Sequence, residues 1–164
     1  HGGGQEFGIR SGTENTPGLA GFGMAAELAA GRLASGEIDN EIRLRDKLID
    51  GLFERIPEIT LTGHRTKRLP YHASICVKYV EGEGMLLMMD AAGIGVSSGS
   101  ACTSGSLEPS YVLLSLGLDH TTAHGSVRMT LSKDTSEEDI NYVLEKFPPI
   151  IEKLRSMSPL YKKN

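Results

Sequence analysis

The stretch Ser74-Ile75-Cys76-Val77-Lys78-Tyr79-Val80 decides the fold class that we predict for this chain. Ile75, Val77 and Tyr79 recur at every second position, which is the period of a strand with one buried face. A few residues later, Gly84–Ala92 has an apolar pattern that indicates a short helix. A strand with one apolar face needs a covering layer, so this succession favours a sheet packed against helices.

The flanking sequence extends this pattern in both directions. Further strands are predicted at 59–62, 95–98 and 126–131. Further helices are predicted at 19–33, 38–53 and 109–116, and from Thr135 or Ser136 to Phe147. Pro148-Pro149 should interrupt or kink that last helix before it resumes at Ile150–Met157. The first two helical patterns are compatible with one long, bent helix or with two helices, and Ser35-Gly36 is the expected break. The predicted fold is a two-layer α/β domain whose small mixed or antiparallel sheet has helices on one face.

The beginning of the chain differs from the rest. Residues 1–12 are rich in glycine and show no hydrophobic period, which indicates irregular backbone. Thr13, Asn15 and Thr16 are candidate caps for the helix that follows, with Pro17 suited to its first turn. We therefore expect residues 1–12 to be a remnant of another domain, and residues 13–164 to form one domain with its linking helix. The first residue, His1, is not Met, which suggests a part of a longer protein.

Composition excludes several function classes. A net charge of −4, scattered Lys and Arg, and 5% aromatic residues argue against nucleic acid binding. No apolar run approaches the roughly 20 residues that a membrane helix needs. The two cysteines, Cys76 and Cys102, form no CxxC pair and no metal-ligand spacing, which favours a reducing, cytoplasmic setting.

A segment rich in glycine and serine surrounds Cys102. Residues 97–106 are small and mostly polar, whereas Cys76 lies in an apolar strand pattern typical of a structural cysteine. Loops of this composition often carry function, and we expect this one to be mobile. A reactive cysteine also needs a base or a lowered pKa, which the sequence alone does not reveal. From composition, a nucleophilic Cys102 and an ordinary surface loop are both open interpretations.

Three ordered motifs resemble one enzyme family. Residues 97–113, SSGSACTSGSLEPSYVL, are similar to the active-site loop of group I cysteine desulfurases of the NifS/IscS type. HGGGQE at residues 1–6, followed by RSGTEN at residues 10–15, resembles the family segment after the cofactor lysine. AHGSVR at residues 123–128 resembles the strand with a substrate-binding arginine, and LRSMSPL at residues 154–160 is also similar. The resemblance covers essentially the whole chain and implies the C-terminal small domain of a fold-type I pyridoxal 5′-phosphate (PLP) transferase, with residues 1–12 as a remnant of the large PLP-binding domain.

The resemblance also implies roles for three residues. Such enzymes use PLP to take sulfur from L-cysteine, leaving alanine, and Cys102 matches the residue that receives the sulfur as a persulfide. Arg128 matches the arginine that binds the substrate carboxylate through two parallel hydrogen bonds. Thr13 matches a threonine that reaches the PLP phosphate of the neighbouring subunit. Without the resemblance, Arg128 would be interpreted as a surface strand residue and Thr13 as a helix cap.

Other parts of the family's site should lie before His1, including the lysine that binds PLP. We therefore expect the 164-residue chain alone to be inactive and to act within a homodimer or with a complementing N-terminal polypeptide. The expected acceptor is an iron–sulfur scaffold protein or another thiol protein. No metal site is expected. The alternatives are a selenocysteine lyase on the same scaffold and a non-catalytic module for dimerisation or scaffold docking.

Overall fold

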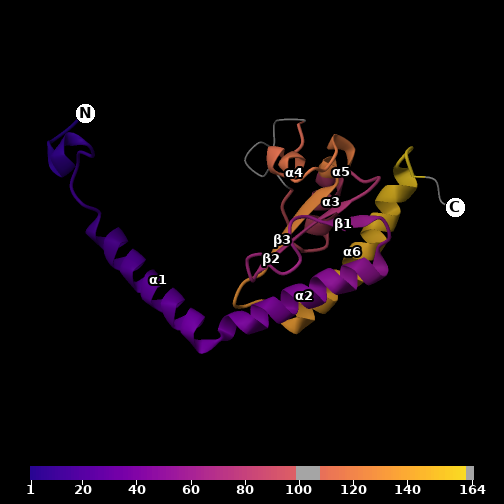
Figure 1. Ribbon diagram of the computed structural model, residues 1–164, viewed down its shortest axis with the longest axis horizontal. Helices are drawn as coiled ribbons and strands as arrows, with labels where there is room; N and C mark the ends of the chain where they lie inside the picture. Colours follow the sequence, from indigo (N-terminus) through magenta and orange to yellow (C-terminus); the bar gives the residue numbers. More distant parts are fainter. Residues whose placement is uncertain (99–107, 162–164) are drawn as a thin grey trace. The chain divides into compact units, whose positions relative to one another are not determined.

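The computed structural model describes residues 1–98 and 108–161 (Figure 1). The chain divides into two compact units, His1–Ile38 and Asp39–Asn164. The predicted domain boundary between Gly12 and Thr13 stays a prediction.

The first unit consists of a short 3₁₀ segment, η1 (Gln5–Gly8), and the long helix α1 (Thr16–Ser35). Of the three candidate caps, Asn15 is the one used, because its side chain accepts the Gly18 N–H at 3.1 Å. The helix ends at Gly36, whose φ of 79° lies in the left-handed region that favours glycine. The predicted break at Ser35-Gly36 is therefore confirmed.

The structure describes every residue of α1, and none of these side chains is buried. Large apolar side chains are among those exposed: Leu19, Phe22, Met24, Leu28 and Leu33.

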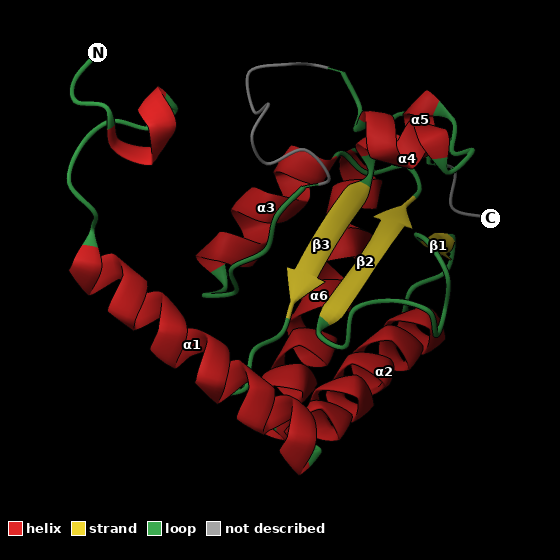
Figure 2. Ribbon diagram, turned by 60° about the vertical axis from the view of Figure 1, so that its left-hand side comes forward, coloured by secondary structure: helices red, strands yellow, loops and turns green. Residues whose placement is uncertain are grey.

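The second unit is a three-stranded antiparallel sheet with helices packed against it (Figure 2). Its strands, in the spatial order β1-β2-β3, are β1 (Ile59–Leu61), β2 (His72–Val77) and β3 (Ser126–Thr130). Its helices are α3 (Gly82–Ala91), α4 (Tyr111–Ser115), α5 (His120–His124) and α6 (Glu137–Met157), together with α2 (Glu37–Arg55), which begins in the first unit. The predicted α/β fold class is confirmed.

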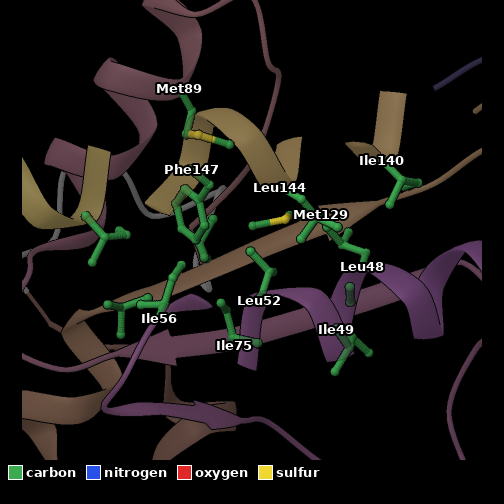
Figure 3. Close-up of a cluster of buried hydrophobic side chains, with 14 of the residues drawn as sticks. Leu48, Ile49, Leu52, Ile56, Ile75, Met89, Met129, Ile140, Leu144 and Phe147 are labelled. Carbon is green, nitrogen blue, oxygen red and sulfur yellow. The ribbon is translucent and has the colours of Figure 1, made fainter. Parts of the chain in front are cut away.

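The main hydrophobic core lies between one face of the sheet and helices α2, α3 and α6 (Figure 3). Ile75 and Val77 of β2 face this core together with Val127 of β3. The helices supply the remaining apolar side chains, among them Leu48, Leu52, Met85, Met89 and Phe147. This face accounts for most of the apolar burial that stabilises the fold.

The opposite face of β2 is covered by the short helices α4 and α5. Cys76 is buried there in a small cluster with Leu113 and Ala123. The expectation of helices on one face only was therefore incomplete. Helices of five residues are too short to show a helical period in the sequence, and α5 was missed entirely for this reason.

Two predicted elements differ in the structure. The predicted strand at Gly95–Ser98 is only an isolated bridge between Ser97 and Arg128. The helix α6 runs without interruption through Pro148-Pro149. Buried side chains on both sides of the prolines, Phe147 before them and Ile151 after them, anchor the helix to the core and offset the lost backbone hydrogen bonds.

Candidate functional site

Alternate residues of β3 point to opposite sides of the sheet. Val127 and Met129 belong to the main core, so Ser126, Arg128 and Thr130 lie on the other side. The antiparallel register places His72 opposite Thr130 and Ser74 opposite Arg128. We call these five residues, Ser126, Arg128, Thr130, His72 and Ser74, the polar face.

Arg128 is half-buried and is held by Ser97. The backbone N–H of Arg128 donates to the Ser97 carbonyl oxygen at 2.6 Å, and the Ser97 N–H donates to the Arg128 carbonyl oxygen at 3.0 Å. The Arg128 Nη2 also donates to the Ser97 Oγ at 3.4 Å. Because Ser97 precedes Cys102 by five residues, the segment that carries this cysteine starts beside the arginine.

Cys102 itself lies outside the described residues, as does the predicted mobile loop apart from its first residue, Ser98. Ser98, the last described residue before Cys102, lies close to the start of α3. A Cβ atom added at Gly82, the first residue of α3, would lie 3.0 Å from the His124 carbonyl oxygen and 3.1 Å from that of Ser126. The same Cβ would lie 3.9 Å from the Ser98 Cβ. The starts of α3 and β3 and the residue Ser98 therefore converge at one end of the sheet.

The polar face favours anions. Burial, followed by the charges of Arg68 and Arg128, lowers the pKa of His72 from its ordinary value of 6.5. The imidazole is therefore neutral at pH 7, and Arg128 supplies the positive charge of this face. A guanidinium offers paired N–H donors in a plane, which match a carboxylate.

Cys76 is a structural cysteine. Its side chain is fully buried, and this burial, with a smaller effect of Asp119, raises the pKa of its thiol to about 11. The thiol is protonated at neutral pH and is a poor nucleophile. The structure thus confirms the interpretation of Cys76 as a strand residue and leaves Cys102 as the candidate nucleophile.

Thr13 is an exposed residue of the first unit, three positions before α1. Asn15 caps that helix, so the interpretation of Thr13 as the cap is wrong. Its predicted contact with a cofactor phosphate stays a prediction.

The described lysines do not fit a covalently attached cofactor. A Schiff-base lysine is typically desolvated or placed next to another cation. Four of the lysines form ion pairs with acidic side chains instead: Lys47, Lys78, Lys133 and Lys146. Two others, Lys67 and Lys153, are exposed. Among residues 1–98 and 108–161, moreover, no cluster of three or more His, Cys, Asp or Glu could hold a metal ion, and no helix there is long and apolar enough to cross a membrane.

Comparison with known proteins identifies the family. The sequence profile of class-V aminotransferases matches residues 3–143. The chain belongs to the aminotransferase class-V family. Among relatives, it is 48% identical over 162 residues to "Cysteine desulfurase IscS 1" of Archaeoglobus fulgidus, covering 99% of this chain and 42% of that protein. It is 51% identical over 158 residues to a "Cysteine desulfurase" of Nostoc sp., covering 96% and 39%.

Solved structures agree with this assignment to the class-V family. A NifS-like protein from Rickettsia africae has a TM-score of 0.78 and 31% identity, covering 92% of this chain and 39% of the other. Another protein described as NifS-like has the same TM-score of 0.78 with 32% identity, covering 94% and 38%. The chain therefore spans about 40% of the length of these class-V relatives.

Ser97 is the residue of this candidate site that the sequence analysis did not single out. It was included in the glycine–serine segment around Cys102, and the two residues that follow it are a serine and a glycine. Its contact with Arg128 depends on a bridge between residues 31 positions apart. A strand pattern at 95–98 was the available signal, but it did not indicate the partner.

Proposed function

We propose that this chain is part of a PLP-dependent cysteine desulfurase, in which Cys102 receives sulfur from L-cysteine. The observation that carries the proposal is the bridge that fixes Ser97, at the start of the Cys102 segment, against Arg128. Substrate binding and sulfur acceptance would then depend on adjoining parts of one site. The names of the relatives support the same activity.

Arg128 is proposed to bind the α-carboxylate of L-cysteine. A bidentate pair between a guanidinium and a carboxylate fixes the orientation of the amino acid as well as its affinity. The half-buried setting of Arg128 strengthens such a pair, since partial exclusion of water lowers the effective dielectric. The neutral His72 nearby does not compete for the carboxylate with a second charge.

Cys102 is proposed to form a bond to the substrate sulfur as the carbon–sulfur bond of L-cysteine breaks. The electron pair of the broken bond stays with carbon, which takes up a proton and yields alanine. The enzyme is left with a persulfide on Cys102. The reaction balances without an external oxidant or reductant, because carbon is reduced as the two sulfur atoms join.

PLP would be held by the complete protein, since the described lysines do not fit its attachment. Bound PLP provides an electron sink for amino-acid chemistry. Thr13 is proposed to contact the phosphate across a subunit boundary. We further propose a cytoplasmic enzyme that acts as a homodimer, or with a complementing N-terminal polypeptide, and passes sulfur to an iron–sulfur scaffold or another thiol protein.

The test compares the two cysteines in the complete protein. Cys102→Ser should retain PLP and abolish persulfide formation, measured by mass spectrometry after L-cysteine is added. The matched control, Cys76→Ser, should keep persulfide formation and lower stability, because Cys76 is buried in β2. Sulfide release by Cys102→Ser at the wild-type rate would show that another residue is the nucleophile. Rapid turnover of L-selenocysteine by the wild-type protein, with none of L-cysteine, would favour the selenocysteine lyase.

A second test uses the 164-residue chain alone. It should neither form a PLP adduct that borohydride can reduce nor release sulfide from L-cysteine. A stoichiometric reducible adduct on this chain would contradict the proposal that the attachment lysine lies elsewhere. If the complete protein also lacked PLP and activity, the non-catalytic docking module would be the better interpretation.

A further inference from the structure

We infer that Ser97 is a positioning residue that orients the Arg128 guanidinium toward the substrate carboxylate. The inference rests on the proposed role of Arg128 and adds a residue that this role requires. Ser97 does not need to touch the substrate. It acts through the arginine, and its effect should therefore appear in substrate affinity.

The backbone fixes Ser97 opposite Arg128. Two hydrogen bonds join their peptide groups, at 2.6 and 3.0 Å, so neither residue can shift along the strand without breaking both. Before this bridge, the segment passes through Gly95 and Val96 without forming a longer strand. The bridge is thus an isolated pair of hydrogen bonds that fixes Ser97 beside Arg128, and not the end of a fourth strand.

The Ser97 hydroxyl has the polarity that a guanidinium needs. Its Oγ donates its single proton to the Ser98 carbonyl oxygen at 3.1 Å. With that proton engaged, the oxygen presents lone pairs to Arg128, whose guanidinium contains donors only. The 3.4 Å contact from Nη2 is therefore correctly directed, although it is long.

The contact leaves the arginine able to bind a carboxylate. A guanidinium carries five N–H groups, and the Ser97 Oγ takes one of them. Two parallel N–H groups remain for a bidentate pair, because only one donor on Nη2 is engaged. Restricting the side chain before substrate arrives reduces the rotamer entropy lost on binding.

The same hydroxyl connects two functions. Its acceptor, the Ser98 carbonyl, belongs to the last described residue before the segment that contains Cys102. Loss of the hydroxyl frees both the guanidinium and this peptide group. We expect the effect on the guanidinium, and so on substrate affinity, to be larger than the effect on the Ser98 peptide group, because the backbone bridge at Ser97 remains.

The experiment uses matched variants of the complete protein. Ser97→Val and Ser97→Thr have nearly the same shape, but only the threonine retains a hydroxyl. Ser97→Val should raise the KM for L-cysteine about 5–10-fold with little change in kcat. This factor is below that for a full hydrogen bond to a charged group because the contact is long, at 3.4 Å. Ser97→Thr should restore most of the affinity. Ser132→Ala, an exposed serine two residues after β3, is the control and should match the wild type.

A second measurement separates carboxylate binding from general damage. The inhibition constant of the product L-alanine should rise in Ser97→Val by the same factor as KM. That of L-alaninamide, which lacks the carboxylate, should not change. Equal rises for both inhibitors, or a fall in kcat with unchanged KM, would overturn the inference.

The two proposals can fail separately. Wild-type kinetics in Ser97→Val, combined with severe loss in Arg128→Ala, would reject the positioning role and leave the substrate-binding role of Arg128 intact. Wild-type kinetics in Arg128→Ala would reject the substrate-binding role itself, and the inference about Ser97 with it.

Discussion

The two faces of the sheet are built from alternate residues of the same strands but have different compositions. On one face, Ile75 and Val127 are buried against α2, α3 and α6. On the other, Ser74 and Arg128 oppose each other on the polar face. The strand period thus lets one short segment serve stability and chemistry at once, and a shift of one residue in register would exchange the two.

The largest effect should come from the core face. Ile75→Ala should lower the free energy of unfolding by about 2–5 kcal/mol, because it removes buried methyl groups and leaves a cavity. Urea denaturation measures this. Thr130→Ala, at an exposed site on the polar face, should change it by less than about 0.5 kcal/mol. Similar losses for both variants would break the distinction between the faces.

Gly125→Ala tests the close backbone contact at the end of the β2–β3 pairing, where the Val77 N–H donates to the Gly125 carbonyl oxygen at 2.8 Å. An added Cβ would lie 2.1 Å from the Val77 carbonyl oxygen, which is backbone and cannot move aside cheaply. We expect a loss of about 3 kcal/mol, near the upper end for overpacking. Gly23→Ala is the matched control, since α1 has open space at that position and alanine favours a helix. Equal stability of the two variants would contradict the close approach.

Alkaline pH should weaken the fold through Cys76. The pKa of its thiol rises from an ordinary 9.0 to about 11 in the folded state, so stability is fully present below pH 9 and declines as pH rises towards 11. Each pKa unit is worth about 1.4 kcal/mol, which limits the decline to roughly 2–3 kcal/mol. The loss between pH 9 and 11 should be smaller in Cys76→Ala than in the wild type. Parallel pH profiles would exclude this thiol as the cause.

Acid should produce the smallest effect, through His72 on the polar face. Its folded pKa lies below 6.5, so the unfolded state binds the proton more readily and stability falls as pH drops below 6.5. His72→Gln should reduce this acid sensitivity, visible as a smaller shift of the urea midpoint between pH 7 and 5. An unchanged or steeper dependence would contradict the half-buried, cation-facing setting of the imidazole.

Much of the fold was predictable from local pattern. The alternation around Ile75, the glycine at residue 36 and the acidic start of α6 were sufficient for a strand, a break and a capped helix. Arg128 and Thr13 were identified through the family motifs, and their predicted roles remain to be tested. The contact between Ser97 and Arg128 was not predictable, because it depends on tertiary pairing between distant residues.

The uninterrupted course of α6 was also missed, because local sequence favours a break at paired prolines. Pro148 and Pro149 lack backbone N–H groups, so the carbonyls of Leu144 and Glu145 have no donor at the usual helical spacing. The cooperativity that normally couples successive turns is therefore weakened at this point. Besides the buried side chain of Ile151, the last turns are held by Arg155. Its guanidinium donates to the carbonyl oxygens of Pro57, Glu58 and Lys78. In amide hydrogen exchange, α6 should thus behave as two segments that open independently. The second segment should exchange faster when the Arg155 contacts are removed.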